Sequence, residues 1–129
     1  MADYLLDTNI LILALRSVPK ALDFLDALDG KKERGCISVA TRTEILAGMR
    51  PYEEERTMEL LNSLENLPLD EATADRAGRL IYQYARQGIQ LSFPDALIAA
   101  TALQHGLTLA TTNPRHFPMP DLRLHPLDE

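Results

Sequence analysis

Three acidic residues and an asparagine, far apart along the chain, adjoin apolar runs. Asp7 follows YLL, Glu44 precedes ILAGM, and Asp95 precedes the almost wholly apolar ALIAATAL, whereas Asn113 comes after LTLAT. Two carboxylates about 4 Å apart repel by roughly 4 kcal/mol at an effective dielectric of about 20, so gathered acids require a positive charge. No Lys or Arg adjoins Asp7 or Asp95, which leaves a divalent cation as the simplest counter-charge.

The chemistry that these residue types favour is metal-assisted hydrolysis. An all-oxygen ligand set without Cys, and without His beside the acids, points to Mg²⁺ or Mn²⁺ rather than zinc. Such an ion acts as a Lewis acid and as a source of hydroxide, so hydrolysis of a phosphodiester follows. Thr8 and Asn9 could orient Asp7 or a water in this site by hydrogen bonds, although helix capping explains them equally well.

Each candidate also has a purely structural explanation. Asp7 could start a helix together with Thr8. Two further pairs have the spacing of a capping box, namely Thr41 with Glu44 and Ser92 with Asp95. Asn113, which precedes Pro114, is a common turn residue.

Alternating strands and helices must position these side chains. The pattern predicts strands at 3–6, 36–39, 67–69 and 107–111, an extended edge-like piece at 121–127, and helices at 10–16, 17–30, 41–49, 52–65, 71–87 and 92–105. Regular alternation implies a parallel sheet covered on both faces. Because ligands bind beyond the carboxyl ends of such strands, we expect Asp7, Glu44, Asp95 and Asn113 to meet at one sheet edge.

Length and composition are those of one globular domain spanning residues 1–129. Hydrophobic residues make up 46% and charged residues 25% of the chain, and no apolar stretch is long enough to span a bilayer. Nothing at the start resembles an export signal, and the one cysteine, Cys36, cannot form an internal disulfide, so we expect a cytoplasmic protein without a membrane anchor. The net charge of -6 argues against nonspecific binding of nucleic acid but does not exclude a nuclease.

Three blocks in order give the chain a family likeness. YLLDTNILILAL at the start, SVATRTEILAG at 38–48 and GIQLSFPDALIAATALQHGLTLATTNPRHF at 88–117 together resemble the PIN-domain ribonucleases, specifically the VapC toxins of bacterial toxin-antitoxin pairs. The resemblance covers essentially the whole chain. It implies an α/β fold, a three-layer α/β/α sandwich with a central parallel sheet, and cleavage of RNA that depends on Mg²⁺ or Mn²⁺.

The resemblance also implies roles for particular residues. Asp7, Glu44 and Asp95 match the acidic metal ligands of the family, and Asn113 falls where the family often has a fourth catalytic aspartate. Asn supplies a neutral oxygen, so a second metal would be held less firmly, and binding substrate or water is the other role open to Asn113. Arg115 is expected to contact a substrate phosphate, and Thr8 and Asn9 are expected beside the substrate. His116 could be a general acid, but packing is the more usual role for a single loop histidine.

The resemblance further implies two partners besides RNA. VapC-like toxins usually pair with a cognate antitoxin, a VapB-like protein whose tail covers the acidic pocket, and usually form homodimers. A tail rich in Arg would suit a pocket with excess carboxylate.

Three other functions compete with the nuclease. An aspartyl-phosphate phosphatase or a receiver module needs a later lysine, yet no Lys occurs after Lys32, and a phosphatase needs an acid at position 9, which is Asn. A non-catalytic PIN-fold module that binds RNA or protein is supported only by Asn113.

Overall fold

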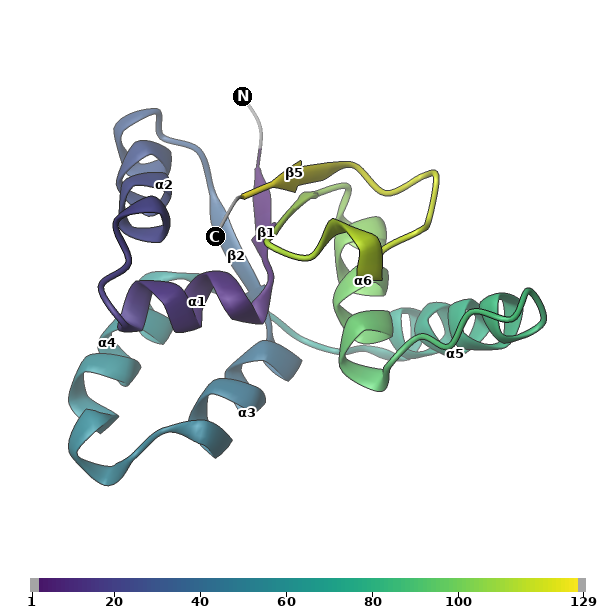
Figure 1. Ribbon diagram of the computed structural model, residues 1–129, viewed down its shortest axis with the longest axis horizontal. Helices are drawn as coiled ribbons and strands as arrows, with labels where there is room; N and C mark the ends of the chain where they lie inside the picture. The colour runs from purple at the N-terminus through teal and green to yellow at the C-terminus, as the bar shows by residue number, and fades with distance from the viewer. Residues whose placement is uncertain (1–2, 128–129) are drawn as a thin grey trace.

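A five-stranded, wholly parallel sheet forms the centre of the computed structural model, which describes residues 3–127 (Figure 1). The strand order is β3-β2-β1-β4-β5. The strands are β1 (Tyr4–Leu6), β2 (Gly35–Ser38), β3 (Glu65–Leu67), β4 (Thr108–Thr111) and β5 (Leu124–Pro126). The predicted parallel sheet is therefore confirmed.

Six helices and two short 3-10 turns connect the strands. The helices are α1 (Thr8–Leu15), α2 (Pro19–Gly30), α3 (Val39–Gly48), α4 (Glu54–Ser63), α5 (Glu71–Ala85) and α6 (Phe93–His105), and the turns are η1 (Pro51–Glu53) and η2 (Pro114–His116). Each predicted helix is present, with ends that differ by a few residues. The third strand lies at 65–67 instead of the predicted 67–69, because Pro68 has no N–H with which to extend the pairing to β2.

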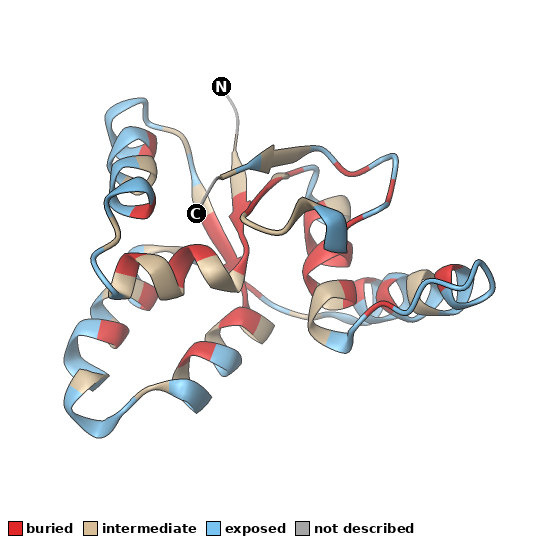
Figure 2. Cartoon of the chain, in the orientation of Figure 1, coloured by how far each residue is buried: buried red, intermediate tan, exposed pale blue. Residues whose placement is uncertain are grey.

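Consecutive residues of the central strands face opposite sides of the sheet. Leu5 packs with Tyr84 of α5 and Ile98 of α6, whereas the next residue, Leu6, packs in a second cluster. That second cluster takes buried residues from the other four helices, namely Leu11, Leu28, Ile45 and Leu61. The burial pattern follows this division, with buried residues concentrated on the strands and on the inner faces of the helices (Figure 2). The predicted three-layer α/β/α arrangement is confirmed.

The strand order places a topological switch at β1. From β1 the chain builds β2 and β3 on one side, then returns through α5 and α6 to place β4 on the other side of β1. The backbone N–H of Asp7 donates to the carbonyl of Ala110 (2.9 Å), which continues the pairing of β1 with β4 by one residue. A crevice therefore opens beside Asp7, at the place where open parallel sheets bind ligands.

Both edge strands are short. β5 ends at Pro126, and β3 begins at Glu65, whose carboxylate lies 2.6 Å from the Arg34 guanidinium. Within residues 3–127, none of the helices has both the length and the apolar character needed to cross a bilayer.

Gly106 ends α6 in the left-handed region, with φ of 64°. A Cβ at this position would meet no atom within 4 Å, so Gly106→Ala changes only the backbone preference. We expect this substitution to destabilise the protein by about 1 kcal/mol, because the left-handed region disfavours a Cβ. Gly78→Ala, in the interior of α5 and equally free of contacts, is expected to stabilise it by about 0.5–1 kcal/mol. Urea unfolding of the two variants checks the opposite signs, and equal effects would contradict this account of Gly106.

Candidate active site

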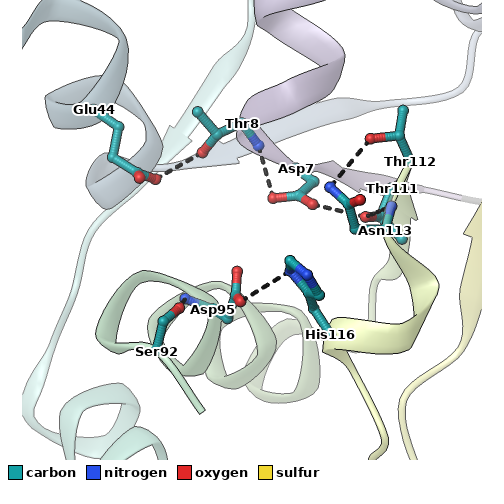
Figure 3. Close-up of polar contacts among 9 residues, drawn as sticks. All are labelled: Asp7, Thr8, Glu44, Ser92, Asp95, Thr111, Thr112, Asn113 and His116. Carbon is teal, nitrogen blue, oxygen red and sulfur yellow. Dashed lines mark hydrogen bonds and ion pairs between the residues drawn. The ribbon is translucent and has the colours of Figure 1, made fainter. Parts of the chain in front are cut away.

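A polar pocket of about 320 Å³ opens beyond the carboxyl ends of β1 and β4. It brings together the four residues predicted to be catalytic (Figure 3), and its lining also includes both predicted substrate residues of α1. Its lining consists of Asp7, Thr8, Asn9, Ile12, Glu44, Ser92, Pro94, Asp95, Ile98, Asn113 and His116. These residues come from α1, α3, α6 and the segment after β4, so the pocket depends on the whole fold.

Asp7 lies at the centre of this pocket and is only 6% exposed. Each carboxylate oxygen accepts one hydrogen bond. The backbone N–H of Thr8 donates to Oδ1 (2.8 Å), and the hydroxyl of Thr111 donates to Oδ2 (2.7 Å). Asp7 is also the N-cap of α1, so the prediction of Thr8 and Asn9 as caps was wrong. The capping and pocket roles coexist, because the cap fixes the orientation of the carboxylate.

Burial raises the pKa of the Asp7 carboxyl above its ordinary value of 3.8. The hydrogen bonds from Thr111 and Thr8 lower the pKa, whereas the negative charges of Asp95 and Glu44 raise it. No Arg or Lys is among the described residues that line the pocket. The partial positive charge at the N-terminus of α1 also favours the ionised form of Asp7, which caps this helix.

Glu44 is connected to Asp7 through Thr8. The Thr8 hydroxyl donates to Oε1 of Glu44 (2.8 Å) and lies 3.1 Å from the hydroxyl of Thr41. The capping-box explanation of Thr41 and Glu44 was wrong, because α3 begins two residues earlier, with Ser38 as its cap. Glu44 lies beyond the first turn of α3, and its side chain is therefore not engaged in capping that helix.

Asp95 lies in the first turn of α6, across the pocket from Asp7 (Figure 3). Its backbone N–H donates to the hydroxyl of Ser92 (3.2 Å), which is one half of a capping box. The carboxylate instead faces His116, whose Nδ1 lies 3.3 Å from Oδ2. His116 thus belongs to the pocket, through a contact that sequence reasoning did not anticipate.

The segment after β4 supplies Asn113 to the pocket and holds it in place. The backbone N–H of Asn113 donates to the Thr111 hydroxyl (2.9 Å), which in turn donates to Asp7. The Asn113 amide nitrogen lies 3.4 Å from the Thr112 hydroxyl. Thr111, fully buried, was missed as a site residue. Its only signal in the sequence was a hydroxyl at the end of an apolar strand.

Arg115 lies beside the pocket but does not line it. It is an exposed residue of η2, between Pro114 and His116. Of these three residues, only His116 is in the pocket lining. Its predicted phosphate contact therefore remains a prediction.

The pocket provides carboxylates for a cation without forming a complete cage. Among residues 3–127, no three His, Cys, Asp or Glu side chains lie close enough together to hold a metal ion jointly. Apart from the His116 imidazole, which contacts Asp95, the available donors are oxygens, and one of them belongs to a buried carboxylate with no Arg or Lys in the pocket lining. This set fits Mg²⁺, which usually keeps several waters and binds through one or two carboxylates.

The raised pKa of Asp7 predicts how stability changes with pH. The native state binds the proton of the Asp7 carboxyl more tightly than the unfolded state does. Ionisation of Asp7 therefore lowers the free energy of unfolding of the metal-free protein as the pH rises above 3.8. Asn caps helices as well as Asp does but carries no charge. Relative to wild type, Asp7→Asn should therefore gain stability as the pH rises above 3.8, until the Asp7 carboxyl of the native state is fully ionised. Denaturant unfolding of both metal-free proteins measures the difference, and a gap that is constant or shrinks with pH would contradict it.

The comparisons with known proteins agree with this geometry. A profile of the PIN domain matches residues 4–120. Ribonuclease VapC10 of Mycobacterium tuberculosis is 40% identical over 116 residues, which cover 89% of this chain and 86% of that protein. The tRNA(fMet)-specific endonuclease VapC of Shigella flexneri is 29% identical and covers 91% of each chain.

A solved structure extends the likeness to the whole fold. A chain of a toxin-antitoxin complex from Klebsiella pneumoniae superimposes with a TM-score of 0.80 and 31% identity, over 98% of this chain and 100% of that one. These likenesses agree with the order of the strands and with the acidic pocket at the switch point of the sheet. The chain belongs to the PIN-domain family and, within it, to the VapC ribonucleases.

Proposed function

We propose that the chain hydrolyses RNA phosphodiester bonds with Mg²⁺ or Mn²⁺ in the pocket that Asp7, Asp95 and Glu44 share, one or two of these carboxylates binding the ion directly and the rest through water. The observation that carries this proposal is the buried Asp7 carboxylate, which shares a pocket with two further acids and with no Arg or Lys in its lining. Membership of the VapC ribonucleases supports the same reaction.

A bound divalent cation supplies Lewis-acid stabilisation of phosphoryl charge and lowers the pKa of water. The residues of the chain orient the groups around it. Thr111 and the Thr8 backbone fix both oxygens of Asp7, and the Thr8 hydroxyl fixes Glu44. Their preset orientation avoids reorganisation when substrate binds.

The neutral members of the pocket contact the substrate in this proposal. Asn9 and Asn113 line the pocket with amide groups, which can donate hydrogen bonds to phosphate or ribose oxygens. Arg115, exposed next to His116, would contact a phosphate outside the pocket. The RNA substrate class is that of the relatives, one of which is named for an initiator tRNA.

A cognate antitoxin is the second proposed partner, with a homodimer as the proposed assembly. The structural relative was solved as a toxin-antitoxin complex. An antitoxin tail that places an Arg in the pocket would neutralise the acids in the same way as a cation, because guanidinium and carboxylate form paired hydrogen bonds. Such a tail would exclude metal and RNA together.

The alternative function is a non-catalytic PIN-fold module that binds RNA or protein. Asn113 favours it, because a neutral amide lies where the family often has a fourth acid. The three remaining acids in one pocket favour hydrolysis.

Substitution of the acids tests the nuclease directly. Purified protein should cleave RNA with Mg²⁺ or Mn²⁺ and be inactive with EDTA. Asp7→Asn and Asp95→Asn should each lower kcat by about a hundredfold or more, since several kcal/mol of charge stabilisation is lost. Asp75→Asn, on the exposed surface of α5, is the matched control and should leave cleavage unchanged. Mg²⁺ should raise the Tm of wild type more than that of Asp7→Asn. Cleavage that persists in both acid variants would refute the assignment.

Co-expression tests the antitoxin. The product of a small adjacent reading frame should co-purify with this chain and suppress cleavage. Glu44→Gln should weaken the complex at low salt, because it removes one charge that the tail would neutralise. The absence of such a reading frame beside this gene in several genomes would count against the proposal.

A further inference from the structure

Phe93 is an exposed aromatic residue at the rim of the acidic pocket. Its side chain is 73% exposed in a chain with only 5% aromatic residues. Leaving a Phe in water forgoes most of the roughly 1.5–3 kcal/mol that its burial would provide. The fold of the isolated chain gives no reason for this exposure.

The position of Phe93 relative to the pocket is fixed by its neighbours. Ser92, Pro94 and Asp95 all line the pocket, and Phe93 lies between the first two. Ser92 caps α6 through the backbone N–H of Asp95, and Figure 3 shows both on the wall that faces Asp7. Pro94 restricts the backbone in the first turn of the same helix. Phe93 therefore lies in the same first turn of α6 as a candidate metal ligand and beside two residues that line the pocket.

Other exposed aromatic residues already have partners. The Tyr52 hydroxyl accepts a hydrogen bond from Arg50 (2.9 Å). The Tyr82 ring lies under the Arg86 guanidinium, 4.8 Å from it, and its hydroxyl accepts from the same residue (2.8 Å). For Phe93, by contrast, no ring or cation-π contact is found within the described chain. Its largely exposed ring is therefore available to a ligand.

We propose that Phe93 is a stacking platform for one base of the RNA, next to the phosphate that enters the acidic pocket. This inference rests on the proposed ribonuclease function. Proteins that recognise unpaired RNA stack its bases on exposed aromatic rings, and such stacking needs no particular base. A phosphate in the pocket places its adjoining nucleotide at the rim, where the ring lies. Phe93 thus selects unpaired RNA and positions it, while the acids act on the phosphate.

Fluorescence tests the contact without any need for cleavage. The chain contains no Trp, so Phe93→Trp introduces a single reporter. In an Asp7→Asn background with Mg²⁺, a short single-stranded RNA should quench this fluorescence, and the same RNA in a duplex should quench it much less. Tyr82→Trp, an exposed position on α5, is the matched control and should respond to neither. Equal responses at the two positions, or no response at Phe93→Trp, would overturn the proposal.

Kinetics test its role in substrate binding. Phe93→Ala should raise KM for single-stranded RNA by at least about fivefold, the lower end of the effect of removing one base-aromatic stack. Its kcat should change little, and Phe93→Tyr should restore KM. Leu22→Ala, which removes an exposed apolar side chain from α2, should leave KM unchanged.

Sedimentation of the same variants separates the platform from a subunit contact. Phe93→Ala should keep the oligomeric state of wild type. If instead it dissociates an oligomer and KM returns to normal at high protein concentration, the ring serves an interface and the proposal is wrong. If wild type cleaves no RNA but Phe93→Trp is still quenched, the nuclease proposal fails while the platform stands.

Discussion

The carboxylate of Asp7, buried between two neighbouring strands, is the constraint around which the pocket is organised. Ionisation of this group is disfavoured by burial and by two further acids, and is compensated by two hydrogen bonds and a helix N-terminus. The hydrogen bonds and the helix N-terminus do not balance the negative charge of the three acids, and no Arg or Lys lines the pocket. If the proposed function is right, a metal ion and an antitoxin guanidinium would compete for the same carboxylates, so that catalysis and inhibition would exclude each other.

The sequence was sufficient for the order of elements and for the edge at which the acids meet. Strand and helix periodicity is local, and in a parallel sheet every strand end that precedes a helix points the same way, so Asp7 and Glu44, which follow β1 and β2, could be placed together. Asp95 begins the helix that leads back into β4, and the start of such a helix lies near the same edge. The contacts within the pocket could not be predicted. Thr111 and Asp7 are 104 residues apart, and their contact depends on β4 returning beside β1.

Local errors in the predictions have local causes. Thr41 and Glu44 have the spacing of a capping box, but α3 begins before them. Its cap is Ser38, whose hydroxyl accepts from the backbone N–H of Ala40. His116 follows a proline in a turn, where spacing gives no information about direction. Its contact with Asp95 requires α6 and η2 to be placed by the core, through buried neighbours such as Phe117.

The flanks of the sheet limit how other chains can attach. Unpaired backbone N–H and C=O groups on an edge strand can pair with an added strand. Here the edge strand β5 ends at a proline, and the edge strand β3 is three residues long and begins with a glutamate. Neither flank offers a template for a foreign β-segment. Partner proteins are therefore expected to bind on the helices or at the pocket, and not by extending the sheet.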